Sequence, residues 1–104
     1  MTSSLKEIDW KTEIEKRASR YRSVTQKALK KISIVAKKNT KEYTIAMDYL
    51  TMANNYFNDA IHFQNKGDFI LAMAAFSYAH AWLDAGVRAG IFDGMGDDQL
   101  FTLP

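Results

Sequence analysis

Apolar residues that recur at alternating spacings of four and three are the feature of this 104-residue chain that most constrains its fold. Such spacings place side chains on one face of an α-helix, whereas a half-buried strand alternates at every second residue. In the N-terminal part, one seam of this kind comprises Ile14, Ala18, Tyr21, Thr25, Ala28, Ile32 and Val35. The pattern predicts a long amphipathic helix with a heptad-like seam.

Two further segments carry the same spacing and are separated by a turn signal. The second seam comprises Tyr43, Met47, Leu50, Asn54, Phe57 and Ile61, and the third comprises Phe69, Met73, Phe76, His80, Leu83 and Val87. Between them lies the sequence N-K-G-D, residues 65–68. Gly67 can adopt the left-handed conformation that follows a helix, and Asp68 can cap the next helix. Gly90 is expected to end the third helix.

These signals predict an all-α fold, an antiparallel three-helix bundle in a single domain of residues 1–104. The helices are expected at about 5–38, 40–65 and 68–89. The start of the first helix stays open, because S-L-K-E at Ser4 and T-E-I-E at Thr12 both resemble capping boxes. Asn39 is expected to cap the second helix.

The tail, residues 90–104, is rich in turn residues and then apolar again at Leu100, Phe101 and Leu103. An apolar terminus in water is unfavourable, so we expect the tail to pack back onto the bundle. The second and third helices also carry extra apolar stripes at Ile45, Tyr49, Met52, Tyr56 and Phe63, and at Leu71, Tyr78 and Trp82. This excess predicts self-association, with a dimer favoured, or another protein partner.

Charge is distributed unevenly along the chain. Residues 1–41 carry twelve Lys or Arg and four Asp or Glu, a net charge of +8, whereas residues 42–104 carry two and eight, a net charge of −6. One face of the first helix gathers the candidate nucleic-acid contacts Lys16, Arg20, Lys27, Lys30, Lys31, Lys37, Lys38 and Lys41. A basic face of this kind suits phosphate contacts, but it also suits packing against acidic helices. Aromatic residues are missing from it, which argues against stacking on single strands.

A second candidate site is a cluster of polar residues on or near the seams. Asn54 and His80 lie on them, Asp84 lies at the edge of one, and Asp59 lies at the border of the extra apolar stripe of the second helix. His80 and Asp84 are four residues apart and can touch along a helix, an arrangement that suits acid–base or metal chemistry. The alternative is a buried histidine satisfied by neighbours. The hairpin geometry places His80 opposite Asn54, so we favour a structural contact between them. Asp59 belongs either to the surface or to a pair with a cation of the first helix.

Several functions lack the residues they require. The chain has no cysteine, and it lacks phosphate-binding glycine loops and nucleophile motifs. His62 and His80 would lie about 13 Å apart along the hairpin, too far to share a metal. The acidic segment at residues 93–98 fails as a calcium loop because its twelfth position is Pro104. We therefore expect no enzyme activity, no cofactor and no metal site.

Membrane insertion is also not expected. The N-terminal sequence MTSSLKEIDW lacks the apolar region of a signal peptide. The longest stretch without a charged residue, 69–83, is shorter than the roughly 20 residues that cross a bilayer. The sequence predicts a cytoplasmic protein.

The segment NDAIHFQNKGDFILAMAAFSYAHAWLDAGVRAGIFD, residues 58–93, resembles an archaeal family of small helical proteins, domain of unknown function 357. Its most specific part is Y-A-H-A-W-L-D-A-G, in which Ala81 replaces the glycine usual in that family. The resemblance implies a helical bundle and an archaeal source, without an established activity. A weaker similarity to HEPN ribonuclease domains lacks their catalytic motif, because Arg88 follows His80 and no histidine follows Arg88.

The sequence therefore favours a protein-interaction or scaffold module that associates with itself. The alternative is a module that binds the backbone of RNA or DNA through the basic face of its first helix.

Overall fold

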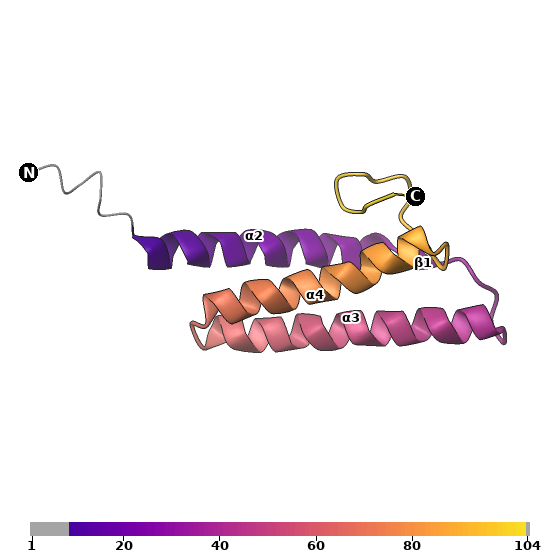
Figure 1. The fold of residues 1–104 in the computed structure, drawn as a ribbon, viewed down its shortest axis with the longest axis horizontal. Helices are drawn as coiled ribbons and strands as arrows, with labels where there is room; N and C mark the ends of the chain where they lie inside the picture. The colour runs from indigo at the N-terminus through magenta and orange to yellow at the C-terminus, as the bar shows by residue number, and fades with distance from the viewer. Residues whose placement is uncertain (1–8, 104) are drawn as a thin grey trace, which may run out of the picture.

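The computed structural model describes residues 9–103 and contains three long helices and a small two-stranded sheet (Figure 1). The helices are α2 (Trp10–Lys31), α3 (Lys41–Asn65) and α4 (Phe69–Arg88), and the strands are β1 (Ser33–Ile34) and β2 (Phe92–Asp93). α2 and α4 run in the same direction, and α3 runs antiparallel to both. The predicted all-α bundle is confirmed.

α4 is the central helix. It packs along α2 on one side and along α3 on the other, whereas α2 and α3 barely touch each other. Two hydrogen bonds join these outer helices near the end of α3: Arg22 Nη1 donates to Gln64 Oε1 at 3.0 Å, and Gln64 Nε2 donates to Ser19 Oγ at 3.3 Å. The bundle is therefore open, and one side of α4 is left uncovered.

The N-terminal caps of α2 and α3 differ from the predicted ones. The carboxylate of Asp9 accepts from the backbone N–H of Thr12 at 3.1 Å, so Thr12 supplies the donor and Asp9 is the cap. The alternative start at Ser4 lies outside the described residues. Thr40, not Asn39, caps α3, and its hydroxyl accepts from Tyr43 N at 3.2 Å. Asn39 has a φ of 67°, whereas a cap requires the extended backbone that Thr40 adopts.

α2 ends at Lys31, well before the predicted end near residue 38. Ile32 is extended, and β1 pairs antiparallel with β2, with Ser33 opposite Asp93. Val35 N also donates to Ile91 O at 3.0 Å. The β-branched side chains of I-S-I-V prefer extended backbone, and pairing with β2 supplies hydrogen bonds that replace those of a helix. Val35, the last residue of the predicted seam, is consequently exposed.

Alanine dominates the buried core. The fully buried alanines are Ala18, Ala28, Ala46, Ala53, Ala60, Ala72 and Ala79, whereas the only large side chains buried to the same degree in the described part of the chain are Phe76 and Leu83. Small side chains allow helix backbones to approach closely. The larger apolar residues therefore lie at the edges of the helix contacts, where many stay partly exposed.

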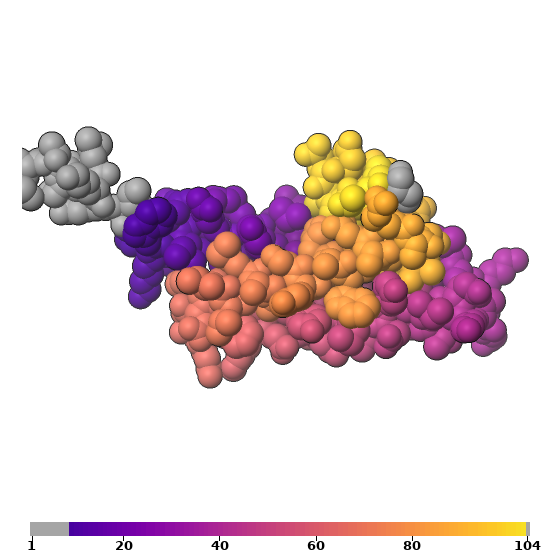
Figure 2. All heavy atoms as spheres, viewed as in Figure 1, coloured from indigo at the N-terminus to yellow at the C-terminus, as the bar shows by residue number. Residues whose placement is uncertain are grey.

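The tail packs back as predicted. Phe92 and Phe101 are only 2% and 3% exposed and join the core cluster around Leu83 and Val87. The residues that follow β2, yellow in Figure 2, gather over the C-terminal end of α4. Gly67 and Gly90 both have positive φ, as their places after helix ends require. Asp68 stands at the N-cap position of α4 but makes no capping hydrogen bond with its side chain.

α4 is, among the described residues, the one helix long and apolar enough by length and composition to cross a membrane. The central helix of a bundle meets the same criterion, because a helix with two packed sides carries few charged residues. In this fold α4 packs against both α2 and α3.

The ring of Phe92 packs so close to the backbone of Gly86 that we expect only glycine to fit at this position. A Cβ atom at Gly86 would lie 2.1 Å from a ring carbon of Phe92. Glycine to alanine normally stabilises a helix, but here we expect Gly86→Ala to lower the free energy of unfolding by about 1–3 kcal/mol through overpacking. Urea unfolding measures the change. In a Phe92→Ala background the same substitution should cost little; an equal cost in both backgrounds would contradict this explanation.

Candidate functional site

An open groove of about 450 Å³ lies between α2 and α4. Its walls are mainly apolar, with Tyr21 and Val24 from α2 and Phe76 and Ala81 from α4. The volume falls within the usual range of ligand sites. The groove lies on the side of α4 that the open bundle leaves uncovered.

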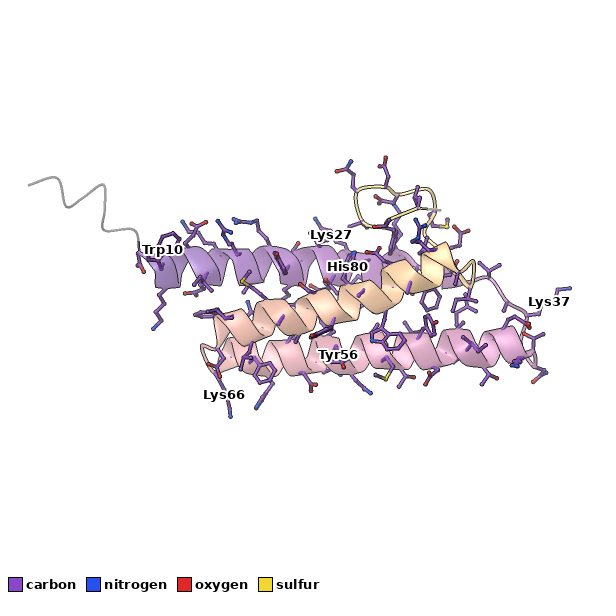
Figure 3. All side chains as sticks on the ribbon, viewed as in Figure 1. Trp10, Lys27, Lys37, Tyr56, Lys66 and His80 are labelled. Carbon is purple, nitrogen blue, oxygen red and sulfur yellow. The ribbon has the colours of Figure 1, made fainter. Side chains whose placement is uncertain are left out.

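The base of the groove is formed by a hydrogen-bonded histidine. His80 lies between α2 and α4 (Figure 3), with Nδ1 3.1 Å from Thr25 Oγ1 and Nε2 bonded to the carbonyl oxygen of Leu100. A carbonyl can only accept, so Nε2 carries the proton and Nδ1 accepts from the Thr25 hydroxyl. Both ring nitrogens are therefore engaged, and His80 joins α2, α4 and the tail.

Asp84 supports the same attachment one turn along α4. Its Oδ1 accepts from Thr102 N at 3.0 Å and lies 3.8 Å from His80 Nε2. Arg88 Nη1 donates to Leu103 O at 3.1 Å, and the Phe101 ring stacks on His80. The predicted proximity of His80 and Asp84 is present, but both side chains bind the tail. This arrangement suits structural support of the tail.

Lys31 also binds the tail, although the sequence placed it among candidate nucleic-acid contacts. Its Nζ is 2.8 Å from Asp97 Oδ2. The hydrogen bond from Lys31, helped by the backbone N–H groups of Leu100 and Gln99, lowers the pKa of Asp97 below its ordinary value. Lys31 is therefore partly neutralised by the acidic tail.

Asn54 and Asp59 do not belong to a buried polar cluster. Both are exposed, and Asn54 Nδ2 donates to Leu50 O of its own helix at 3.0 Å. α3 packs through Ala46, Ala53 and Ala60, and the residues directly before and after each of them are turned by about 100° away from that contact. The predicted pair of His80 with Asn54 is therefore wrong, and Thr25 takes the place of Asn54. Thr25 lies on a predicted seam, but Leu100 contributes a backbone atom that no side-chain pattern marks.

The candidate basic residues do not share one helix face. Lys16, Lys27 and Lys30 are exposed on α2, and Figure 3 shows Lys27 on the side away from α4. Lys37 and Lys38 lie in the connection after β1, and Lys41 begins α3, because α2 ends at Lys31. Arg20 instead lines the groove, with Nη2 4.0 Å from Glu13 Oε1.

The extra apolar stripes of α3 and α4 partly cover each other. The rings of Tyr49 and Trp82 meet edge to face with centroids 5.0 Å apart, and those of Tyr56 and Tyr78 are 5.4 Å apart. The more open surface of α4 is a line of exposed residues beside the groove, which we call the α4 ridge: Ile70, Ala74, Ser77, Ala81 and Ala85. Four of its five members are small, so another helix could approach closely there.

This fold and groove define a small all-α protein with three helices and a tail that packs onto them. Residues 9–103 contain no group of three or more metal-ligating side chains. Residues 20–92, well over half of the chain, match the family described as "Protein of unknown function (DUF357)". The chain belongs to this family, which confirms the resemblance found in the sequence. Comparisons with curated proteins and with solved structures gave no match.

Removing the Thr25 hydroxyl should weaken the junction of α2, α4 and the tail. Thr25 is 2% exposed, so Thr25→Val leaves the lone pair of His80 Nδ1 without a donor. We expect the free energy of unfolding to fall by about 1–3 kcal/mol. Urea unfolding measures it, with Thr44→Val as a matched control because Thr44 is exposed and its hydroxyl donates only locally, to the backbone oxygen of Thr40. Equal effects of the two substitutions would show that the hydrogen bond contributes little.

Proposed function

We propose that this protein is a protein-interaction module that associates with itself through the groove and the α4 ridge. The observation that carries the proposal is a largely apolar surface on a central helix that two neighbours leave uncovered, with a charged residue only at each end of its groove. Tyr21 and Val24 are 42% and 40% exposed at the groove, and Ile70 of the ridge is more exposed still. Contiguous apolar surface of this kind marks interaction sites in small proteins.

The chemistry of the groove supports binding over catalysis. His80 is the residue best suited to acid–base work, and both of its ring nitrogens are engaged in holding the fold together. Asp84 holds the tail through Thr102. The remaining walls are apolar or small, which suits packing against another helical surface.

Self-association should depend on the α4 ridge. We expect the native chain to have a dimer mass in sedimentation velocity experiments and to dissociate on dilution. Ala81→Glu places a charge at the centre of the surface and should give a monomer, since a buried unpaired carboxylate is costly. The control is Asn55→Glu, on an exposed part of α3 away from the groove. A native monomer at every concentration, or an unchanged mass for Ala81→Glu, would contradict the proposal.

A second candidate function is binding to nucleic-acid backbone through α2. The ion pairs of α2 within residues 9–103 involve Arg17, Arg20 and Lys31. Lys16, Lys27 and Lys30 are exposed and take part in none of them, so their charges stay available for phosphates. This surface lies beside the groove rather than within it, and the two functions are compatible.

Phosphate binding can be tested by fluorescence anisotropy with RNA and DNA oligonucleotides at low and physiological salt. Lys27→Glu with Lys30→Glu should abolish binding that weakens steeply with salt, because counterion release drives such complexes. Lys66→Glu, at the distant turn before α4 (Figure 3), is the matched control for loss of positive charge. Binding that is absent at low salt, or equally reduced by the control, would rule out a specific role for these lysines.

A further inference from the structure

We infer that the groove binds the same groove of a second copy across a two-fold axis, with the two α4 helices antiparallel and Arg20 of each copy beside Asp84 of the other. This inference rests on the proposed self-association and specifies its geometry. It is carried by the order of charges along the groove, by the register between α2 and α4, and by the small residues between the charges.

The register of the two helices places opposite charges at opposite ends of the groove. The Thr25–His80 hydrogen bond sets these residues side by side, and α2 and α4 run in the same direction (Figure 1). Arg20 precedes Thr25 by five residues, about 7.5 Å at the helical rise, and Asp84 follows His80 by about 6 Å. Both side chains line the groove, so a cation and a carboxylate lie about 13 Å apart along it.

A two-fold axis perpendicular to the helices makes the charges of two facing grooves complementary. It exchanges the two ends of the groove while keeping α2 over α2 and α4 over α4. Arg20 on α2 of one copy then lies level with Asp84 on α4 of the other and reaches it across the groove, and the same pair forms twice because the interface is isologous. A parallel arrangement would instead bring like ends together, Arg20 near Arg20 and Asp84 near Asp84. The charges therefore favour the antiparallel arrangement and disfavour the parallel one.

The middle of the groove allows the close approach that this arrangement needs. Ser77 and Ala81 lie between the levels of Arg20 and Asp84, and both are small and exposed. The axis passes between them, so Ser77 of one copy faces Ala81 of the other. Tyr21 and Val24 border this centre and would be covered by their counterparts. The contact has apolar and small residues at its centre and paired charges at its ends, as protein interfaces commonly have.

Both charges can form the new pair without giving up an essential contact. The Arg20 side chain is 63% exposed, and its one ion-pair neighbour within residues 9–103, Glu13, is 4.0 Å away. The Asp84 side chain is 29% exposed and bonds Thr102 N through a single oxygen, Oδ1. An arginine fork can therefore approach the other oxygen.

The test exchanges the charges and then mixes the variants. Arg20→Asp puts two carboxylates at each end of the dimer, and Asp84→Arg puts two cations there. Each variant alone should raise the dimer dissociation constant about tenfold or more. In a one-to-one mixture every end again pairs an acid with a base, so heterodimers should form with near-native affinity. Sedimentation velocity of each variant and of the mixture measures this.

Because Asp84 also holds the tail, two further measurements keep the test decisive. Asp84→Asn keeps an acceptor for Thr102 N while removing the charge, so it should weaken the dimer and leave the unfolding transition nearly unchanged. The chain has no cysteine, so Ser77→Cys and Ala81→Cys can be mixed under mild oxidation. The two variants should cross-link to each other, and Asn55→Cys should cross-link to neither.

The possible outcomes distinguish this antiparallel geometry from the proposed self-association on which it rests. A monomeric native protein would overturn both. The antiparallel geometry would be overturned if the charge exchanges left the dissociation constant of the dimer unchanged. It would also be overturned if Ser77→Cys cross-linked to itself better than to Ala81→Cys. In either case self-association would occur through another arrangement. Restored affinity in the mixture, together with the mixed cross-link, would establish the geometry.

Discussion

The structure depends most on the two hydrogen bonds of the His80 ring. One nitrogen binds Thr25 and fixes the register of α2 against α4, and the other binds Leu100 and fixes the tail. An imidazole can bond through both ring nitrogens, which point to opposite sides of the ring, so it can join two elements at once. The register in turn decides which residues of α2 and α4 line the groove, so a buried structural contact determines the layout of the exposed surface.

The alanine core explains why such a surface exists at all. Helices that meet through Ala18, Ala60 and Ala72 approach closely and leave no room between them for larger side chains. Those side chains are displaced to the edges, where no further element among residues 9–103 covers them. The tail covers one edge with Phe101. The edge at the groove stays open, and a partner is the natural way to bury it.

The helical period, the turn at Gly67 and the return of the tail could be predicted because each depends on local residue types. The site could not be predicted to the same degree. Placing the α3 seam one residue too far turned Asn54 inward, although α3 packs through Ala53 and Ala60. Alanine gives a weak apolar signal, so pattern analysis follows the larger residues beside it. The end of α2 and the Leu100 contact depend on long-range backbone pairing, which carries no periodic mark.

The polar residues that resembled a catalytic pair thus have a structural role with a consequence for recognition. Asp84 is held in place by Thr102, and Thr102 is held by a tail that His80, Arg88 and Lys31 secure. The carboxylate at one end of the groove is therefore oriented by the fold and does not have to be ordered on binding, which reduces the entropic cost of pairing it. Arg20 is long and flexible, so it can adapt to that fixed carboxylate. A rigid acceptor and a mobile donor lie at opposite ends of the groove, and in the proposed dimer an antiparallel copy would satisfy both ends at once.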